Sequence, residues 1–331
     1  MRTRNWPLLA ALFALVAGAT STALADGKSD VALAPQDTMA LLHVDLRALR
    51  GTSLFQDILK QIKTRPDAQQ GLAEVKKTFG FDPETDLHGV TVILSDKFSE
   101  NEQMAVVVEA DVEPKTVAAA LEKEGKGKLT RTQHEGTEVL GGPGGEGLAF
   151  TAGKRAVMGP KPMVERALSA SKGKGALAKD GALRKLVDGV DTSKHVWFAA
   201  SLPANVRQQM GPQGKDLESV SGSIDLSRGI GLRLNIGTAS AEAAKAIVTQ
   251  VQAGVQDPQA QPMLTMLGIA PALQAMKTVA KGKVVSVALD LTQDQVMKLK
   301  AMAGMMMMGG GMGGPPGAPP PGARTLPPPQ K

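Results

Sequence analysis

Methionine is the residue type whose clustering most suggests chemistry in this sequence. Five methionines lie close together near the C-terminus, namely Met305, Met306, Met307, Met308 and Met312. Thioether sulfur is a ligand that Cu(I) prefers, so these residues are candidates for a metal site. Copper-binding tails, however, space methionine and histidine in short repeats, and no histidine lies nearby. An apolar tail or interaction segment is therefore the favoured interpretation, and copper binding is the alternative.

Histidine, serine and the carboxylates form no pattern that is typical of a catalytic centre. No two of the four histidines stand at metal-ligand spacing from each other. His43 and Asp45 share one face of an expected strand, where solvated neighbours are favoured over a catalytic or metal role. Serine is never found in a Gly-x-Ser-x-Gly elbow, and no carboxylate pair matches a glycosidase or protease pattern. We therefore predict no catalytic residue and no cofactor.

Three Gly-Lys clusters resemble phosphate-binding loops only superficially. They lie at 125–128, 172–175 and 281–283. A phosphate loop requires Gly-x-x-x-x-Gly-Lys-Ser/Thr between a strand and a helix, and none of the clusters has that form. Each follows an expected helix, where glycine adopts the left-handed cap and lysine complements the helix dipole. Helix termination is the favoured interpretation, with an anion-binding patch as the alternative.

Composition argues against several classes of partner. The chain has two Trp, seven Phe and no Tyr, so it is poor in the aromatic side chains on which bases and sugars stack. Lysine and arginine are interleaved with acids rather than gathered in a basic arm. We therefore predict no nucleic-acid partner. The absence of cysteine excludes disulfides, thiolate metal sites and lipid attachment through an N-terminal cysteine.

The N-terminus has the pattern of a secretory signal peptide, predicted over residues 1–25. Arg2 and Arg4 precede the apolar run 7–17, and the small-residue sequence 23–25 (ALA) offers a cleavage site after Ala25. The apolar run is shorter than the roughly 20 residues that cross a bilayer. We expect a periplasmic or extracellular protein with no integral membrane segment once the signal has been cleaved.

The remaining chain predicts an α+β fold. Alternating apolar residues, as in Ile230, Leu232 and Leu234, indicate antiparallel strands with one wet face. Helices with 3.6-residue periodicity follow the strands, and we expect them to pack on one face of the sheet. We also expect a Met- and Leu-rich helical region over 262–280 that is kinked or broken near Pro271. Residues 304–331, rich in Met, Gly and Pro, predict a disordered tail.

Two stretches share one order of elements, which suggests an internal repeat. Residues 89–124 and 219–254 each predict strand, turn, strand, bend and amphipathic helix. We therefore predict two diverged modules, 26–175 and 176–303, that arose by duplication. The shared features specify a fold, so we expect any function to lie on loops where the copies differ.

The start of the first module also resembles known sequences. The stretch ALLHVDLRALRGTSLFQDIL combines a strand ending in Asp-Leu with a capped helix containing Ser-Leu-Phe. This arrangement resembles the opening of secreted bacterial proteins of unknown function with repeated α+β modules, chiefly over residues 36–124. The resemblance implies export and an α+β fold, and it brings no activity or site residues.

These observations favour a non-enzymatic binding or scaffold protein of the cell envelope. Its partner would be an envelope protein or polymer. One alternative is periplasmic copper handling through the methionine-rich tail. Another is a hydrolase whose site is assembled from residues distant in sequence. The sequence does not indicate an oligomeric state.

Overall fold

The computed structural model describes most of the chain between Gly27 and Met308. The described residues are 27–96, 104–124, 129–152, 154–211, 214–259 and 261–308. The predicted signal peptide, 1–25, lies outside this part of the chain, and so do residues 309–331 of the predicted tail. No described helix combines the length and the apolar character that crossing a membrane requires.

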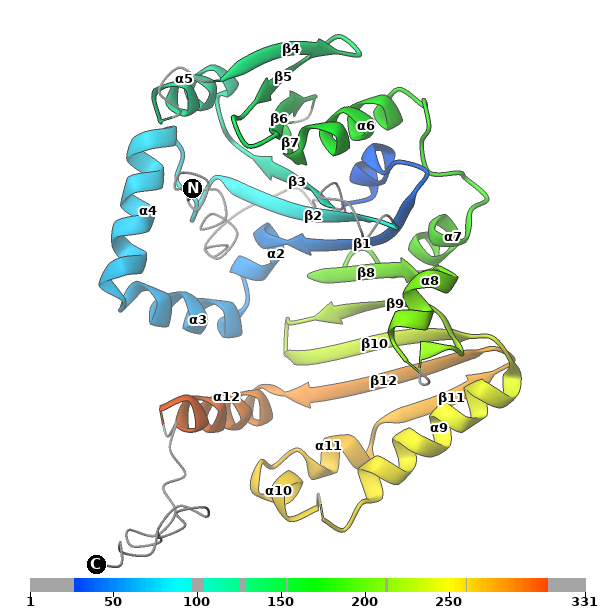
Figure 1. The fold of residues 1–331 in the computed structure, drawn as a ribbon. Helices are drawn as coiled ribbons and strands as arrows, with labels where there is room; N and C mark the ends of the chain where they lie inside the picture. Colours follow the sequence, from blue (N-terminus) through cyan, green and yellow to red (C-terminus); the bar gives the residue numbers. More distant parts are fainter. Residues whose placement is uncertain are drawn as a thin grey trace, which may run out of the picture.

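The described strands form one twelve-stranded sheet in which paired neighbours run antiparallel (Figure 1). They are β1 (Thr38–Asp45), β2 (Leu87–Ser95), β3 (Met104–Ala110), β4 (Thr130–His134), β5 (Thr137–Gly141), β6 (Glu146–Thr151), β7 (Arg155–Pro160), β8 (Val196–Ser201), β9 (Leu217–Asp225), β10 (Gly229–Thr238), β11 (Lys277–Lys281) and β12 (Val284–Thr292). The predicted α+β class with an antiparallel sheet is confirmed.

Helices connect and cover these strands. They are the 3₁₀ helix η1 (Lys28–Leu33) and the α-helices α2 (Leu46–Arg50), α3 (Ser53–Lys63), α4 (Pro66–Phe79), α5 (Pro114–Glu124), α6 (Lys161–Ser171), α7 (Ala182–Asp188), α8 (Ala204–Gln209), α9 (Ala241–Gln256), α10 (Gln261–Met266), α11 (Ala270–Gln274) and α12 (Gln293–Met308). Their ends follow local signals. Thr52 accepts a hydrogen bond from the backbone N–H of Phe55 and caps α3, and Gly80, in the left-handed region, ends α4.

The strand order divides the sheet into two halves that meet at β1 and β8. From that seam outward the first half runs β1-β2-β3-β7-β6-β5-β4, and the second runs β8-β9-β10-β12-β11. Helix α5 follows β3, the third strand from the seam in the first half, and α9 follows β10, the third strand from the seam in the second half. This common order is what a duplication would produce, and the duplication itself stays a prediction.

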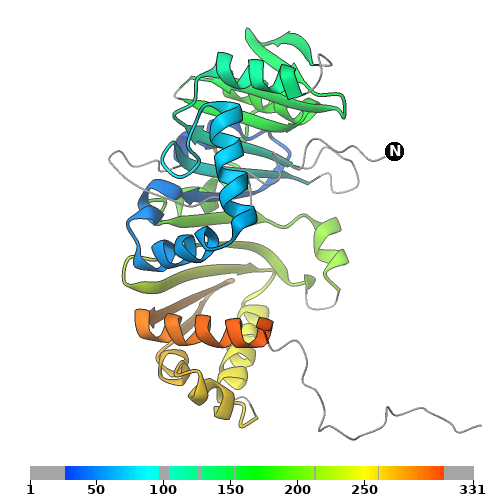
Figure 2. The ribbon, with the colours of Figure 1, turned by 90° about the vertical axis from the view of Figure 1, so that its left-hand side faces the viewer.

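Helices pack on both faces of the first half, whereas we expected them on one face. The first face carries Val44, Val90 and Val108 and is covered by α2–α5. Figure 2 shows α3 and α4 along this side of the molecule. The second face carries Leu41 and Val107. The physical reason is the central strand β3, whose consecutive valines are apolar toward both faces and require cover on both.

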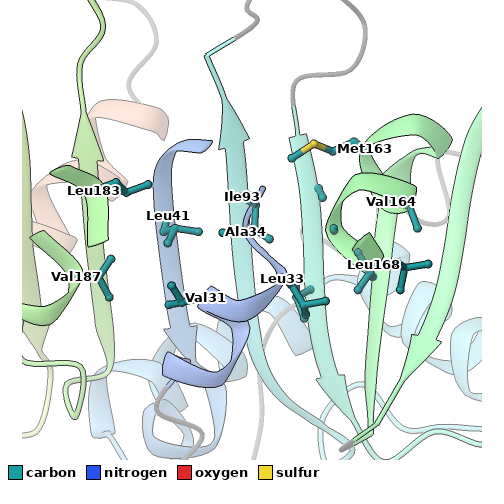
Figure 3. Close-up of a cluster of buried hydrophobic side chains, with 14 of the residues drawn as sticks. Val31, Leu33, Ala34, Leu41, Ile93, Met163, Val164, Leu168, Leu183 and Val187 are labelled. Atoms are coloured by element: carbon teal, nitrogen blue, oxygen red, sulfur yellow. The ribbon is translucent and has the colours of Figure 1, made fainter. Parts of the chain in front are cut away.

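The second face of the first half is covered by η1, α6 and α7. Figure 3 shows their apolar side chains converging on the sheet. Val31 and Leu33 of η1, Val164 of α6 and Val187 of α7 are all buried against it. The chain that follows the predicted cleavage site is therefore part of the core rather than a free linker.

The second half keeps one face apolar and the other polar. Ala244 and Ile247 of α9 pack on the first face against Leu234, Ile236 and Val285. The second face carries Ser221, Ser223, Arg233, Asn235 and Ser286, placed opposite one another by the strand register. This part of the sheet has the one wet face that its alternating sequence predicts.

Two expected boundaries are wrong. The helical region expected over 262–280 is broken near Pro271, with Gly268 in the left-handed region between α10 and α11, but it ends early, because residues 277–281 form the strand β11 and pair with β12. Helix α12 continues through 304–308, past the predicted start of the tail, since Met is a good helix former.

Candidate polar binding groove

A groove with a volume of about 600 Å³ crosses the second face of the second half. Its lining comes from β9, β10, β12, the turn between β9 and β10, and the segment after α7. The charged residues of the lining are Asp191, Lys194, Asp225, Arg228, Arg233 and Asp290. The groove is therefore balanced between three cations and three anions and lined mainly by polar groups and glycine backbone.

Strand register places the charges of one wall together. Gly231 of β10 lies between Asp225 of β9 and Asp290 of β12. Because glycine has no side chain, the space between the two aspartates is open. Arg233, next on the same face, reaches Asp290 with two hydrogen bonds, Nη1 to Oδ1 at 2.8 Å and Nη2 to Oδ2 at 3.1 Å. This bidentate geometry orients the guanidinium across the groove.

A second ion pair forms the other wall. Lys194 Nζ lies 2.9 Å from Asp225 Oδ2, and the backbone N–H of Ser227 donates to Asp225 Oδ1 at 2.9 Å. The hydrogen bonds from Ser227 and the Lys194 ammonium hold the pKa of Asp225 well below its usual range. The hydrogen bond to Asp225 in turn raises the pKa of Lys194. Both groups stay charged at neutral pH, and the turn between β9 and β10 is held in place.

The floor of the groove contains the side chain of Ser223. Ser223 is 4 % exposed and pairs in the sheet with Arg233 on one side and Trp197 on the other. Within the described part of the chain, no hydrogen-bond partner is found for its side chain. Arg228, on the turn, is exposed and likewise has no acidic partner among the described residues.

His195 stands beside the groove without the geometry of a catalytic histidine. Its Nδ1 accepts a 3.1 Å hydrogen bond from the backbone N–H of Leu226 and lies 3.4 Å from Asp225 Oδ1. Burial lowers its pKa. In a catalytic triad the histidine donates Nδ1–H to the carboxylate, and here Nδ1 is an acceptor. The pair therefore does not reproduce the triad arrangement.

The structure gives separate partners to His43 and Asp45, the pair that the strand pattern suggested. His43 is 1 % exposed, its Nδ1 lies 2.8 Å from Thr91 Oγ1, and its ring stacks on Trp197 with centroids 5.6 Å apart. Asp45 caps α2 by accepting a hydrogen bond from the backbone N–H of Ala48. Both residues are buried, so the expectation of solvated neighbours is wrong, and each has its own structural partner.

The structure gives little support to the other sites that we considered from the sequence. No group of three or more His, Cys, Asp or Glu with metal-binding geometry occurs among the described residues. The backbone of Met305, Met306, Met307 and Met308 forms the end of α12, and Met312 lies outside the described residues. The copper hypothesis therefore stays a prediction.

Sequence reasoning located part of this groove and missed the rest. The alternation that makes one face of β9 and β10 apolar leaves Ser223, Arg233 and Asn235 on the wet face. Lys194 and Asp290 were missed, because they enter the groove only through the pairing of β9 with β8 and of β10 with β12. The one local signal was the position of Asp290 on the polar side of an alternating strand.

The fold and the groove define an α+β protein with an open polar groove on one face of its sheet, and comparison with known proteins adds little. No family model and no curated protein matches the chain. Among solved structures, crystal form III of TP0453 aligns with a TM-score of 0.46 and 8% identity, covering 81% of this chain and 97% of that one. Crystal form I of TP0453 gives a TM-score of 0.46 and 7% identity over 86% and 98%. Similarity this distant assigns neither a family nor a function.

Proposed function

We propose that this chain is a non-enzymatic binding protein that holds a polar partner in the groove over β9, β10 and β12. The observation that carries the proposal is the contrast between the two halves of one sheet face. In the first half that face is apolar and sealed by η1 and α6, whereas in the second half it is polar and hollowed.

The charged side chains of the groove support binding rather than proton transfer. Lys194 and Arg233 are held by Asp225 and Asp290, so the walls are ordered before a partner arrives. A preorganised polar surface lowers the entropic cost of binding. A general base would instead need a carboxylate or imidazole with a pKa near the working pH, whereas the pKa of Asp225 lies well below its usual range and Nδ1 of His195 already accepts a hydrogen bond from Leu226.

The location and partner in this proposal rest on the sequence. The pattern of residues 1–25 supports export, and the partner is an envelope protein or polymer. N-terminal sequencing of the secreted protein tests the location. A mature chain that begins near Asp26 supports it, and one that begins at Met1 refutes it.

A site-specific photocrosslink tests the groove. A benzophenone side chain is introduced at Asn235, which lines the groove, and in a separate protein at Lys245, which is exposed on α9. We expect envelope adducts from position 235 and none from position 245. Equal adducts from both positions, or none from position 235, would refute the proposal.

A further inference from the structure

Two side chains of the groove have hydrogen-bonding capacity that the described structure does not use. Ser223 lines the floor of the groove, and its hydroxyl makes no hydrogen bond to another described side chain or backbone group, so it is open to a ligand. Arg228 is the cation of the lining that has no described acid beside it. Lys194 and Arg233 are already occupied by aspartates. The unused capacity is therefore one hydroxyl in the floor and one guanidinium at the turn.

The guanidinium of Arg228 favours a ligand with a negatively charged group. An arginine fork matches a carboxylate in two parallel hydrogen bonds, and it stays protonated at any physiological pH. The three aspartates of the lining repel further anions elsewhere in the groove. A ligand with isolated carboxylates along a polar chain fits this distribution better than a continuous polyanion does.

The other residues that line the groove favour one chemical type of ligand over another. Among the described residues, no aromatic side chain lines the groove, so a sugar ring would find none of these surfaces on which to stack. The ion pairs of the walls and the hydroxyl of Ser223 offer donors and acceptors that suit a peptide backbone. A volume of about 600 Å³ lies in the range of sites that enclose a short segment or a drug-sized ligand.

We propose that the groove binds an acidic peptide segment, with one carboxylate on Arg228 and a backbone carbonyl accepting from Ser223. This inference rests on the proposed function and gives the chemistry of its partner. Binding should weaken as salt is added, because Arg228 is exposed and its pairing is screened.

The test uses the full mature chain and a capped synthetic hexapeptide of alternating Glu and Ser, with calorimetry as the readout. We expect binding of this peptide and at least tenfold weaker binding of the matching Gln-Ser peptide. Arg228→Gln should weaken binding of the acidic peptide about tenfold, equivalent to about 1.4 kcal/mol. Ser223→Ala should weaken it several-fold, and Arg228→Lys should retain part of it. Lys245→Gln, on the other side of the sheet, is the control and should change nothing.

Three results would overturn the inference. The first is equal binding of the Glu and Gln peptides, and the second is an acidic-peptide affinity that Arg228→Gln leaves unchanged. The third is binding of polygalacturonate, an acidic polysaccharide, in place of the peptide. The crosslink at position 235 distinguishes failure of this inference from failure of the proposed function. Adducts would still form there if the groove bound a partner other than an acidic peptide. Circular dichroism confirms that each variant is folded.

Discussion

The hydroxyl of Thr91 donates a 2.6 Å hydrogen bond to Asp30 and joins η1 to the middle of the sheet. Thr91 also lies 2.8 Å from His43 Nδ1, and Asp30 lies 3.6 Å from Arg155 Nε. Because the single Thr91 proton is given to Asp30, the hydroxyl accepts from His43. These buried polar contacts fix the N-terminal segment over the second face.

Replacement of Thr91 should therefore destabilise the protein. Thr91→Val keeps the shape and removes the hydroxyl, so the buried Asp30 carboxylate loses the hydrogen bond that Thr91 donates. We expect the free energy of unfolding to fall by about 1–3 kcal/mol in urea titrations. Thr91→Ser keeps the donor and should lose less. Equal losses in the two variants would show that the methyl group, rather than the hydrogen bond, matters.

His195 should make stability depend on pH. Burial lowers its folded-state pKa below the unfolded value of about 6.5, so on acidification the unfolded chain takes up a proton first. The free energy of unfolding should be highest above about pH 6.5 and fall as the pH decreases toward the folded-state pKa. His195→Asn, whose amide oxygen can still accept from the backbone N–H of Leu226, should show a smaller fall. Urea midpoints at neutral and mildly acidic pH measure the difference.

The Arg233–Asp290 pair should contribute little to stability despite its geometry. Its side chains are 55% and 70% exposed, so solvent screens the attraction. We expect Asp290→Asn to change the free energy of unfolding by less than about 1 kcal/mol. The same variant frees Arg233 and should alter ligand binding in the groove. A large loss of stability would contradict this assignment of the pair to the binding surface.

Two glycines should respond to alanine in opposite directions. Gly159 has φ 153°, and a Cβ there would lie 2.6 Å from the backbone oxygen of Met104. Gly159→Ala should destabilise the pairing of β7 with β3. Gly71, inside α4, has open space around a Cβ, so Gly71→Ala should stabilise by about 0.5–1 kcal/mol. Thermal unfolding of the two variants checks both signs.

The methionine-rich C-terminus should not control copper binding if it serves as an apolar or interaction segment. Deletion of 304–331 should then leave the affinity for Cu(I), measured in competition with a chromogenic chelator, unchanged. A Cu(I) affinity that is present in the full chain and lost on deletion would establish the copper alternative.

The sequence by itself determined the local elements and their faces. Thr52 and Ser240 are residue types that favour the N-cap position, and both accept capping hydrogen bonds at the start of a helix. The alternation in β10 indicated a wet face, whereas the valines of β3 are apolar toward both faces although we expected helices on one face only. These properties depend on residues a few positions apart, which propensity and periodicity report directly.

The tertiary structure alone decided where the polar faces meet. Arg233 reaches Asp290 across 57 positions of sequence, and Thr91 reaches Asp30 across 61. Such pairs depend on strand order and register, which are set by the packing of the whole sheet and by no local pattern. The same packing sealed one half of the second face with η1 and α6 and left the other half open as a groove.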